Sequence, residues 1–359
     1  MKKIDWYILK KFLGTFVFIL FLLLLITVVI DVSEKIDNFL DGAVPLKEIL
    51  FTYYVSFLPY IGAMLAPFFV LVACIFFTSQ LADRSEIIAI LNSGSSFYRM
   101  LRPYAAGAFI LGGSLWFCNN YLVPYSNKKR LQFEHKYISK YIDNISLNYH
   151  RQIAPETYLF MENYRPSDAA GFKFAIDRFH NSKLVYRLRA DKIEWLKNSN
   201  NWRLTNWYER TERSELEDVI RVGKLLDTSF VFKPSDFKYT ENVKEEMTTP
   251  ELTHYIEEMR AGGQNYIEFY EVERYRRTAS AASVFIMTLI GVSVASRKVR
   301  GGLGWHLVLG IGLSALYEII GKFSVTFSTN ATLPPVLGVW IPNLIFGVLA
   351  IYLLKKAPK

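Results

Sequence analysis

The chain has 359 residues, of which 51% are hydrophobic and 16% aromatic, and its 42 Lys and Arg exceed its 33 Asp and Glu to give a net charge of +9. Its two cysteines, Cys74 and Cys118, both lie in apolar stretches, so the composition excludes a disulfide framework. The five histidines are scattered without a paired ligand spacing, and the sequence therefore predicts no metal site.

Six apolar stretches flank one long polar region, three on each side. A helix needs about 20 residues to cross a hydrocarbon core of about 30 Å. The predicted spans are residues 12–30, 49–82, 103–127, 278–296 and 301–317, with a sixth helix inside 323–354. Pro59 and Pro67 predict a kink or tilt in the long second stretch, Glu318 is predicted to end the fifth span, and Pro334 and Pro335 to close the loop before the sixth. No small-residue cleavage site follows the first stretch, so we expect a retained helix rather than a signal peptide.

Basic residues gather on one side of this arrangement. With six spans both chain ends share a side, and short loops rich in Lys and Arg stay in the cytoplasm. That side holds thirteen basic and three acidic side chains, namely Lys2, Lys3, Lys10, Lys11, Arg84, Arg99, Arg102, Arg297, Lys298, Arg300, Lys355, Lys356 and Lys359 against Asp5, Asp83 and Glu86. The net charge is thus a topology signal, which predicts cytoplasmic termini and a polar domain on the opposite side, and it does not require a nucleic-acid partner.

The polar region divides the chain into a first membrane half (1–127), a β-rich domain (128–264) and a second membrane half (265–359). Alternating apolar residues in 172–176, 184–189 and 202–207 predict strands of a sandwich or roll. Near its end, Thr249 is predicted to cap a helix with Pro250 in the first turn, and Gly262 with Gly263 to stop it. A second helix from about residue 265 is predicted to run into the fourth span.

Catalytic motifs are missing from the sequence. It contains no phosphate-binding loop of the Gly-x4-Gly-Lys-Ser/Thr type and no Gly-x-Ser-x-Gly elbow. We therefore expect a non-catalytic protein without a cofactor of its own. Any work against a gradient would draw on a partner or an ion.

The segment between the second and third spans carries the most specific pattern. Ser85 is predicted to cap a short helix that Gly94 ends, with Ile87, Ile88, Ile90 and Leu91 on one apolar side. Two interpretations stay open on pattern alone. The segment is either a polar turn between two spans or a helix that enters a groove on another protein.

Residues 84–88 (RSEII) and 92–94 (NSG) resemble the coupling-helix signature of the YjgP/YjgQ family, the lipopolysaccharide export permeases LptF and LptG. The resemblance extends to residues 5–10 (DWYILK), to the insert between the third and fourth spans, and to residues 333–342 (LPPVLGVWIP). The compact insert and the N-terminus are more similar to the LptG type.

This resemblance implies a fold of six transmembrane helices with an inserted periplasmic β-jellyroll-like domain, in the inner membrane of a bacterium. It implies an ABC-transporter permease that pairs with a second LptF/LptG-type permease and extracts lipopolysaccharide for outer membrane biogenesis. An LptB-like ATPase dimer would bind ATP and Mg, and LptC/LptA-like proteins would form the periplasmic bridge. The implied ATPase-coupling residues are Arg84, Ser85, Glu86, Ile87, Ile88, Leu91, Ser93 and Gly94.

Candidate substrate contacts are the cations near the side opposite the termini. They are Lys35, Lys47, Arg274, Arg276, Arg277 and Lys322, for which interfacial snorkelling is the alternative role. At the end of the first span the sequence has Asp31 followed by Lys35, where the family implies basic residues. Glu318 is predicted to pair with Lys322 one helical turn later.

Two other classes of function remain open from the residues. An ion-coupled secondary transporter would use Glu318 and Lys322 as a relay, although no inverted repeat is visible in the two halves. A membrane-anchored periplasmic binding or sensor protein would use the membrane part only to hold the β-rich domain. Co-purification with an ATPase discriminates the permease from both.

Overall fold

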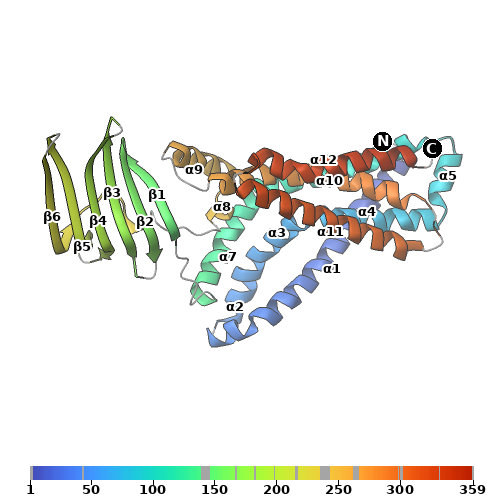
Figure 1. Ribbon diagram of the computed structural model, residues 1–359. Helices are drawn as coiled ribbons and strands as arrows, with labels where there is room; N and C mark the ends of the chain where they lie inside the picture. Colours follow the sequence, from blue (N-terminus) through green and yellow to red (C-terminus); the bar gives the residue numbers. More distant parts are fainter. Residues whose placement is uncertain are drawn as a thin grey trace. The chain divides into compact units, whose positions relative to one another are not determined.

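The computed structural model describes residues 3–42, 44–138, 146–165, 168–181, 183–197, 199–214, 217–234, 243–261, 267–297, 299, 302–330 and 332–357. Its contacts divide the chain into two units (Figure 1). The helical unit comprises Met1–Ile138, Lys244–Leu252 and Glu268–Lys359, and the sheet unit comprises Ser139–Val243 and Thr253–Ile267. The predicted fold class, a helical membrane protein with a β domain inserted in mid-chain, is confirmed.

Five described helices are long and apolar enough to cross a membrane: α1 (Lys3–Asp41), α4 (Ala66–Asp83), α10 (Ile267–Ala295), α11 (Gly302–Thr329) and α12 (Pro335–Lys356). The predicted third span is not among these five. It is nevertheless helical throughout, in α6 (Phe97–Phe117), the π-helix η2 (Cys118–Leu122) and the start of α7 (Val123–Tyr137). α10 is one continuous helix, as the sequence predicts for the connector that enters the fourth span.

The second apolar stretch is broken, as its prolines predict. α2 (Leu46–Glu48) precedes it, the stretch begins with the π-helix η1 (Ile49–Tyr54) and α3 (Val55–Met64), and a turn at Leu65 separates α3 from α4. Pro67 has no backbone N–H, so it cannot bond to the carbonyl of Ala63 and continue the helix. Two shorter helices therefore replace one long span.

The fifth span is longer than the sequence predicts. α11 continues through Glu318 to Thr329, and α12 begins at Pro335 after the predicted loop. Glu318 is half-buried and Lys322 is exposed. The charged heads need not be buried against a neighbouring helix, and a helix can continue past such residues.

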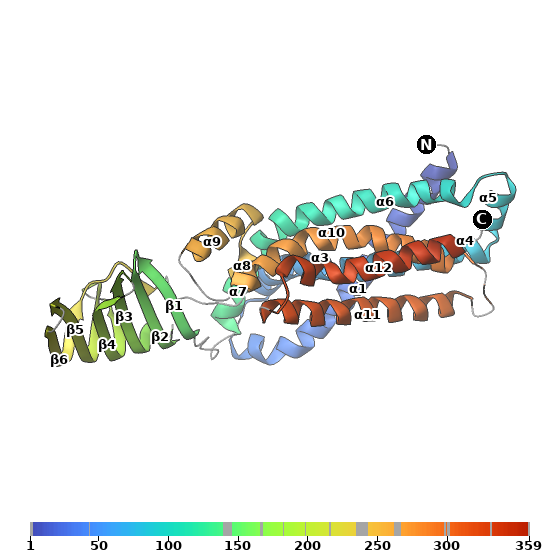
Figure 2. The ribbon, with the colours of Figure 1, turned by 45° about the horizontal axis from the view of Figure 1, so that its top comes forward.

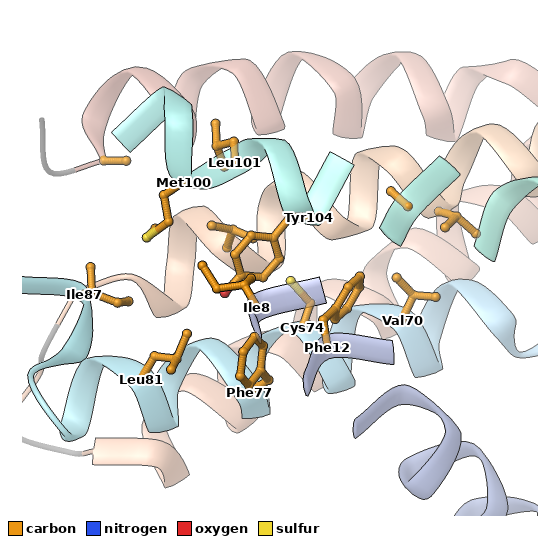
Figure 3. Close-up of a cluster of buried hydrophobic side chains, with 14 of the residues drawn as sticks. Ile8, Phe12, Val70, Cys74, Phe77, Leu81, Ile87, Met100, Leu101 and Tyr104 are labelled. Atoms are coloured by element: carbon orange, nitrogen blue, oxygen red, sulfur yellow. The ribbon is translucent and has the colours of Figure 1, made fainter. Parts of the chain in front are cut away.

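Close helix approaches build the core of the helical unit. One buried cluster joins residues of α1, α4, α5 (Glu86–Asn92) and α6, including Ile8, Phe77, Leu81, Ile87 and Tyr104 (Figure 3). α11 and α12 approach so closely at Gly338 that an added Cβ would lie 1.8 Å from the Ser328 hydroxyl oxygen. Small residues at such contacts are typical of helices that pack within membranes.

The sheet unit contains one antiparallel sheet of six consecutive strands: β1 (Ser146–Ala154), β2 (Thr157–Arg165), β3 (Ala170–His180), β4 (Lys183–Leu196), β5 (Asn201–Ser214) and β6 (Glu217–Thr228). The three predicted strands are confirmed as parts of β3, β4 and β5. Trp202 is fully buried in the apolar core on one face, and its indole N–H donates to the Phe232 carbonyl at 3.0 Å. Burial in the same core raises the pKa of Tyr164 to about 12.

Two short helices follow the sheet, α8 (Val243–Glu246) and α9 (Thr249–Ala261). α9 begins where the sequence predicts, but its cap is Thr248 rather than Thr249. The Thr248 N–H and hydroxyl both donate to the Glu251 carboxylate at 2.8 Å. These bonds hold the pKa of Glu251 below its ordinary value. Gly262 and Gly263, the predicted stop, lie outside the described residues.

Candidate functional site

The predicted coupling segment forms a separate short helix at one end of the helical unit. α5 connects α4 to α6 at the end where α1 begins and α12 ends, which we call the α5 end (Figures 1 and 2). Gly94 adopts a left-handed conformation (φ +81°) and closes α5, as predicted. Ser85 occupies the predicted N-cap position, but its backbone is also left-handed (φ 61°) and its side chain makes no capping hydrogen bond. The sharp turn out of α4 therefore defines the start of α5.

The apolar side of α5 divides between an anchor and an exposed surface. Ile87 is 1% exposed in the cluster of Figure 3, and Ile90 and Leu91 pack against that cluster. Ile88 is 49% exposed. One buried isoleucine thus fixes the helix while its neighbour faces away from the helical unit.

Polar residues of the predicted coupling segment stay accessible. Arg84, Ser85, Ser93 and Gly94 are exposed. The half-buried Glu86 accepts a hydrogen bond from the Tyr7 hydroxyl at 3.3 Å, which connects α5 to α1. The structure therefore presents a short helix with a charged start and an exposed isoleucine.

The opposite end of the helical unit, where α1 ends and α7 begins, is the α7 end. Lys35 lies there in a tight polar contact set. Its ammonium nitrogen is 2.9 Å from the Asp31 carboxylate and 3.2 Å from the Glu134 carboxylate. The Tyr53 and Tyr54 hydroxyls donate to Asp31 at 3.2 and 3.1 Å. Two carboxylates thus already neutralise Lys35, a candidate substrate contact.

The three predicted arginines on α10 differ in their surroundings. Arg277 is 3% exposed and bonds to Glu273 (3.2 Å), to the Thr249 hydroxyl (3.0 Å) and to the Lys244 carbonyl (3.0 Å). Arg276 pairs with Glu273 at 2.7 Å, but 45% of its side chain is exposed. Arg274 donates to the Tyr275 hydroxyl at 2.7 Å. Arg277 therefore has a structural role, and Arg276 is the more accessible of the two arginines that bind Glu273.

Arg130 joins the surroundings of Lys35 to those of Arg277. It donates to Asn127 at 2.9 Å and lies 3.5 Å from Glu134 and 3.7 Å from Glu245. The eight charged residues Asp31, Lys35, Arg130, Glu134, Glu245, Glu273, Arg276 and Arg277 form what we call the α7-end network. The sequence analysis did not single out Arg130, Glu134, Glu245 or Glu273, although the four-residue spacings of Arg130–Glu134 and Glu273–Arg277 were available signals.

A cavity of about 50 Å³ lies within this end. Its lining comes from α3, η2, α7, α8 and α10 and consists of Tyr60, Ala63, Met64, Asn119, Val123, Pro124, Asn127, Glu245, Glu273, Arg276, Arg277 and Ser280. The volume and the many polar atoms suit a few ordered waters rather than an acyl chain.

The remaining predicted cations lie apart from this cavity lining. Lys47 is exposed on α2. Glu318 and Lys322 lie one turn apart on α11, as predicted, but the contacts described for this part of the chain include no direct ion pair between them. The structure therefore does not gather all six predicted substrate contacts into one site.

Five helices long and apolar enough to cross a membrane, together with a mid-chain β domain, place the chain in the class of helical membrane proteins. The model of the family described as lipopolysaccharide export system permease LptF/LptG matches residues 6–356, and the chain therefore belongs to this family. It is also similar to the lipopolysaccharide export system permease protein LptG of Haemophilus influenzae, with 32% identity over 110 residues. That match spans 29% of this chain and 29% of the relative.

Proposed function

We propose that this chain is the permease subunit of an ATP-driven transporter that extracts lipopolysaccharide from the inner membrane and passes it to a periplasmic bridge. The family match over residues 6–356 is the observation that carries the proposal. The permease is non-catalytic and of the LptG type, with cytoplasmic termini and a periplasmic sheet unit. ATP and Mg bind to a partner chain.

The partners follow from the family. They are an LptB-like ATPase dimer, a second LptF/LptG-type permease, and LptC/LptA-like bridge proteins. Lipopolysaccharide is the substrate. Lys47, Arg276 and Lys322 are the predicted substrate contacts with the most exposed side chains, and they are the first to test.

α5 is the proposed docking element for the ATPase. A short helix that enters a groove needs one face fixed to its own protein and one face free. Ile87 lies on the fixed face and the exposed Ile88 on the free face, with Glu86 beside them. Rigid-body movement of an ATPase bound to this helix would also move α4 and α6, because short turns join α5 to both.

The test compares two isoleucines of nearly equal exposure. Ile88 is 49% exposed and Ile36, near the other end of α1, is 46% exposed. Residue 36 is about 50 Å along α1 from the first residue of this helix at the α5 end, at about 1.5 Å per residue. Tagged wild type, Ile88→Asp and Ile36→Asp are purified in mild detergent from membranes that contain all partners, and the bound ATPase is quantified.

Ile88→Asp is expected to reduce the recovered ATPase at least about tenfold, since a charge replaces an apolar contact in a buried groove. Ile36→Asp is expected to retain it. Equal recovery with both variants would exclude α5 as the docking element. Absence of an ATPase from the wild-type preparation would contradict the permease proposal itself.

A further inference from the structure

The chain segment that leads from the sheet back to α10 is fastened to the helical unit by buried polar contacts. Lys244–Leu252 packs with the helical unit and contains the end of α8 and the first turn of α9. Arg277 of α10 donates to the Lys244 carbonyl and to the Thr249 hydroxyl, both at 3.0 Å. The Thr249 hydroxyl in turn donates to the side-chain oxygen of Asn120 in η2. We call Lys244–Leu252 the return segment.

Glu245 is the acidic contact of the return segment. Its carboxylate accepts a hydrogen bond from the Asn127 amide at 3.1 Å and lies 3.7 Å from the Arg130 guanidinium, while its side chain is only 17% exposed. It also lines the 50 Å³ cavity together with Glu273 and Tyr60. A carboxylate that is buried beside another carboxylate is costly to keep ionised.

Charged and titratable groups face Glu245 from each helix packed around it. They are Arg130 on α7, Tyr60 on α3, Glu273 and Arg276 on α10, and Lys244 on α8 itself. Burial raises the pKa of Glu245 above its ordinary value and the charge of Glu273 adds to the rise, whereas Arg276, Arg130 and Lys244 oppose it. The net direction is upward, so the docked segment retains a proton at a pH where a free glutamate is ionised.

We propose that protonation of Glu245 controls whether the return segment stays docked against α7 and α10. When Glu245 is protonated, the segment docks without burying a second ionised carboxylate beside Glu273. When Glu245 ionises, undocking lets the carboxylate reach water. Release of the segment would lengthen the covalent connection between the sheet and α10, which makes Glu245 a positioning residue for that connection.

Because the pKa of Glu245 is raised in the docked segment, docking is weakened as the pH rises. Below the ordinary glutamate pKa of 4.5, docked and released segments are both protonated and docking has its full stability. As the pH rises above that value, the released segment ionises first, and docking is progressively weakened until the raised pKa is passed. A higher pH at the α7 end therefore favours release of the return segment.

The experiment measures hydrogen exchange of peptides that cover Lys244–Leu252, in the full chain purified with its membrane partners. Exchange is corrected for the intrinsic effect of pH, and protection at about pH 5 is compared with protection at about pH 8. Glu245→Gln mimics the neutral carboxyl. Glu257→Gln on α9 is the matched control, because Glu257 is exposed and lies outside the network.

Wild-type protection is expected to fall about threefold to tenfold over this range, because the released segment ionises at a lower pH than the docked one. Glu245→Gln should stay protected at both values, and Glu257→Gln should follow the wild type. Wild-type protection that is independent of pH, or an unchanged pH dependence in Glu245→Gln, would overturn the proposal. As a second measurement, infrared pH-difference spectra should contain a protonated carboxyl band that Glu245→Gln lacks, and a band that persists would equally overturn it.

Discussion

At the α7 end of the helical unit, four acidic and four basic side chains are joined in one network around a small polar cavity, and Arg277 within it is 3% exposed. At the α5 end, a seven-residue helix is fixed by one buried isoleucine, its charged residue Glu86 is half-buried, and Arg84 just before it is exposed. Charged side chains at the α7 end therefore pair with one another inside the protein, whereas those at the α5 end remain accessible to a partner. The two ends should accordingly respond differently to substitution.

The largest effect is expected at Glu273, which pairs with both Arg276 and Arg277. Glu273→Gln leaves the buried Arg277 charge without its carboxylate, and we expect a loss of about 3–5 kcal/mol in unfolding free energy. Thermal unfolding of the purified chain measures it, with Glu268→Gln in the first turn of the same helix as the control. If the two variants unfold alike, ion pairing does not hold the α7 end together.

A second test compares adjacent residues at the α5 end. Ile87→Ala is expected to cost about 2–5 kcal/mol, because its side chain is 1% exposed and its removal leaves a cavity. Ile88→Ala should change stability by less than about 0.5 kcal/mol in the isolated chain, since its side chain is 49% exposed. Chemical denaturation of both variants measures the difference. Equal losses would contradict the division of α5 into an anchored and a free face.

The smallest effect is expected at the start of α9, within the return segment. Thr248→Val removes the hydroxyl bond to Glu251 and should reduce local stability by about 1 kcal/mol. Since the pKa of Glu251 is lowered, the cap stabilises α9 above the ordinary value of 4.5, and this contribution is lost as the pH falls through the lowered value. Hydrogen exchange of α9 should show a difference between wild type and Thr248→Val that narrows in acid, while Thr248→Ser retains the wild-type behaviour. If the difference between wild type and Thr248→Val does not change with pH, the effect comes from packing and not from the bond to Glu251.

Much of the helical arrangement could be predicted because membrane burial imposes long apolar runs. Pro59 and Pro67 predicted a kink or tilt in the second stretch, and the chain breaks next to Pro67 while Pro59 lies inside α3. Pro334 with Pro335 indicated the loop before α12. Glu318 misled the prediction of the fifth span, because its charge was taken as a boundary although α11 continues past this half-buried residue to Thr329.

The α7-end network could not be predicted as a whole, because its members come from four separate segments of the chain, α1, α7, α8 and α10. The i,i+4 pairs Asp31–Lys35, Arg130–Glu134 and Glu273–Arg277 were visible, but the contacts of Arg130 and Asn127 with Glu245 depend on tertiary folding. For the same reason the sequence indicates Asp31 as a partner of Lys35, whereas Glu134 pairs with Lys35 only in the folded chain. α5 was predictable in position, whereas the left-handed turn at Ser85 was not.

Transport by the reconstituted complex tests the central claim most directly. The tagged chain, purified from its native membranes with the proteins bound to it, is placed in vesicles that contain lipopolysaccharide, and a soluble bridge protein is added as acceptor. The account predicts ATP hydrolysis that responds to lipopolysaccharide, together with transfer of lipopolysaccharide to the acceptor that requires ATP. A preparation in which the chain is recovered with neither an ATPase nor ATP-dependent transfer would contradict the account.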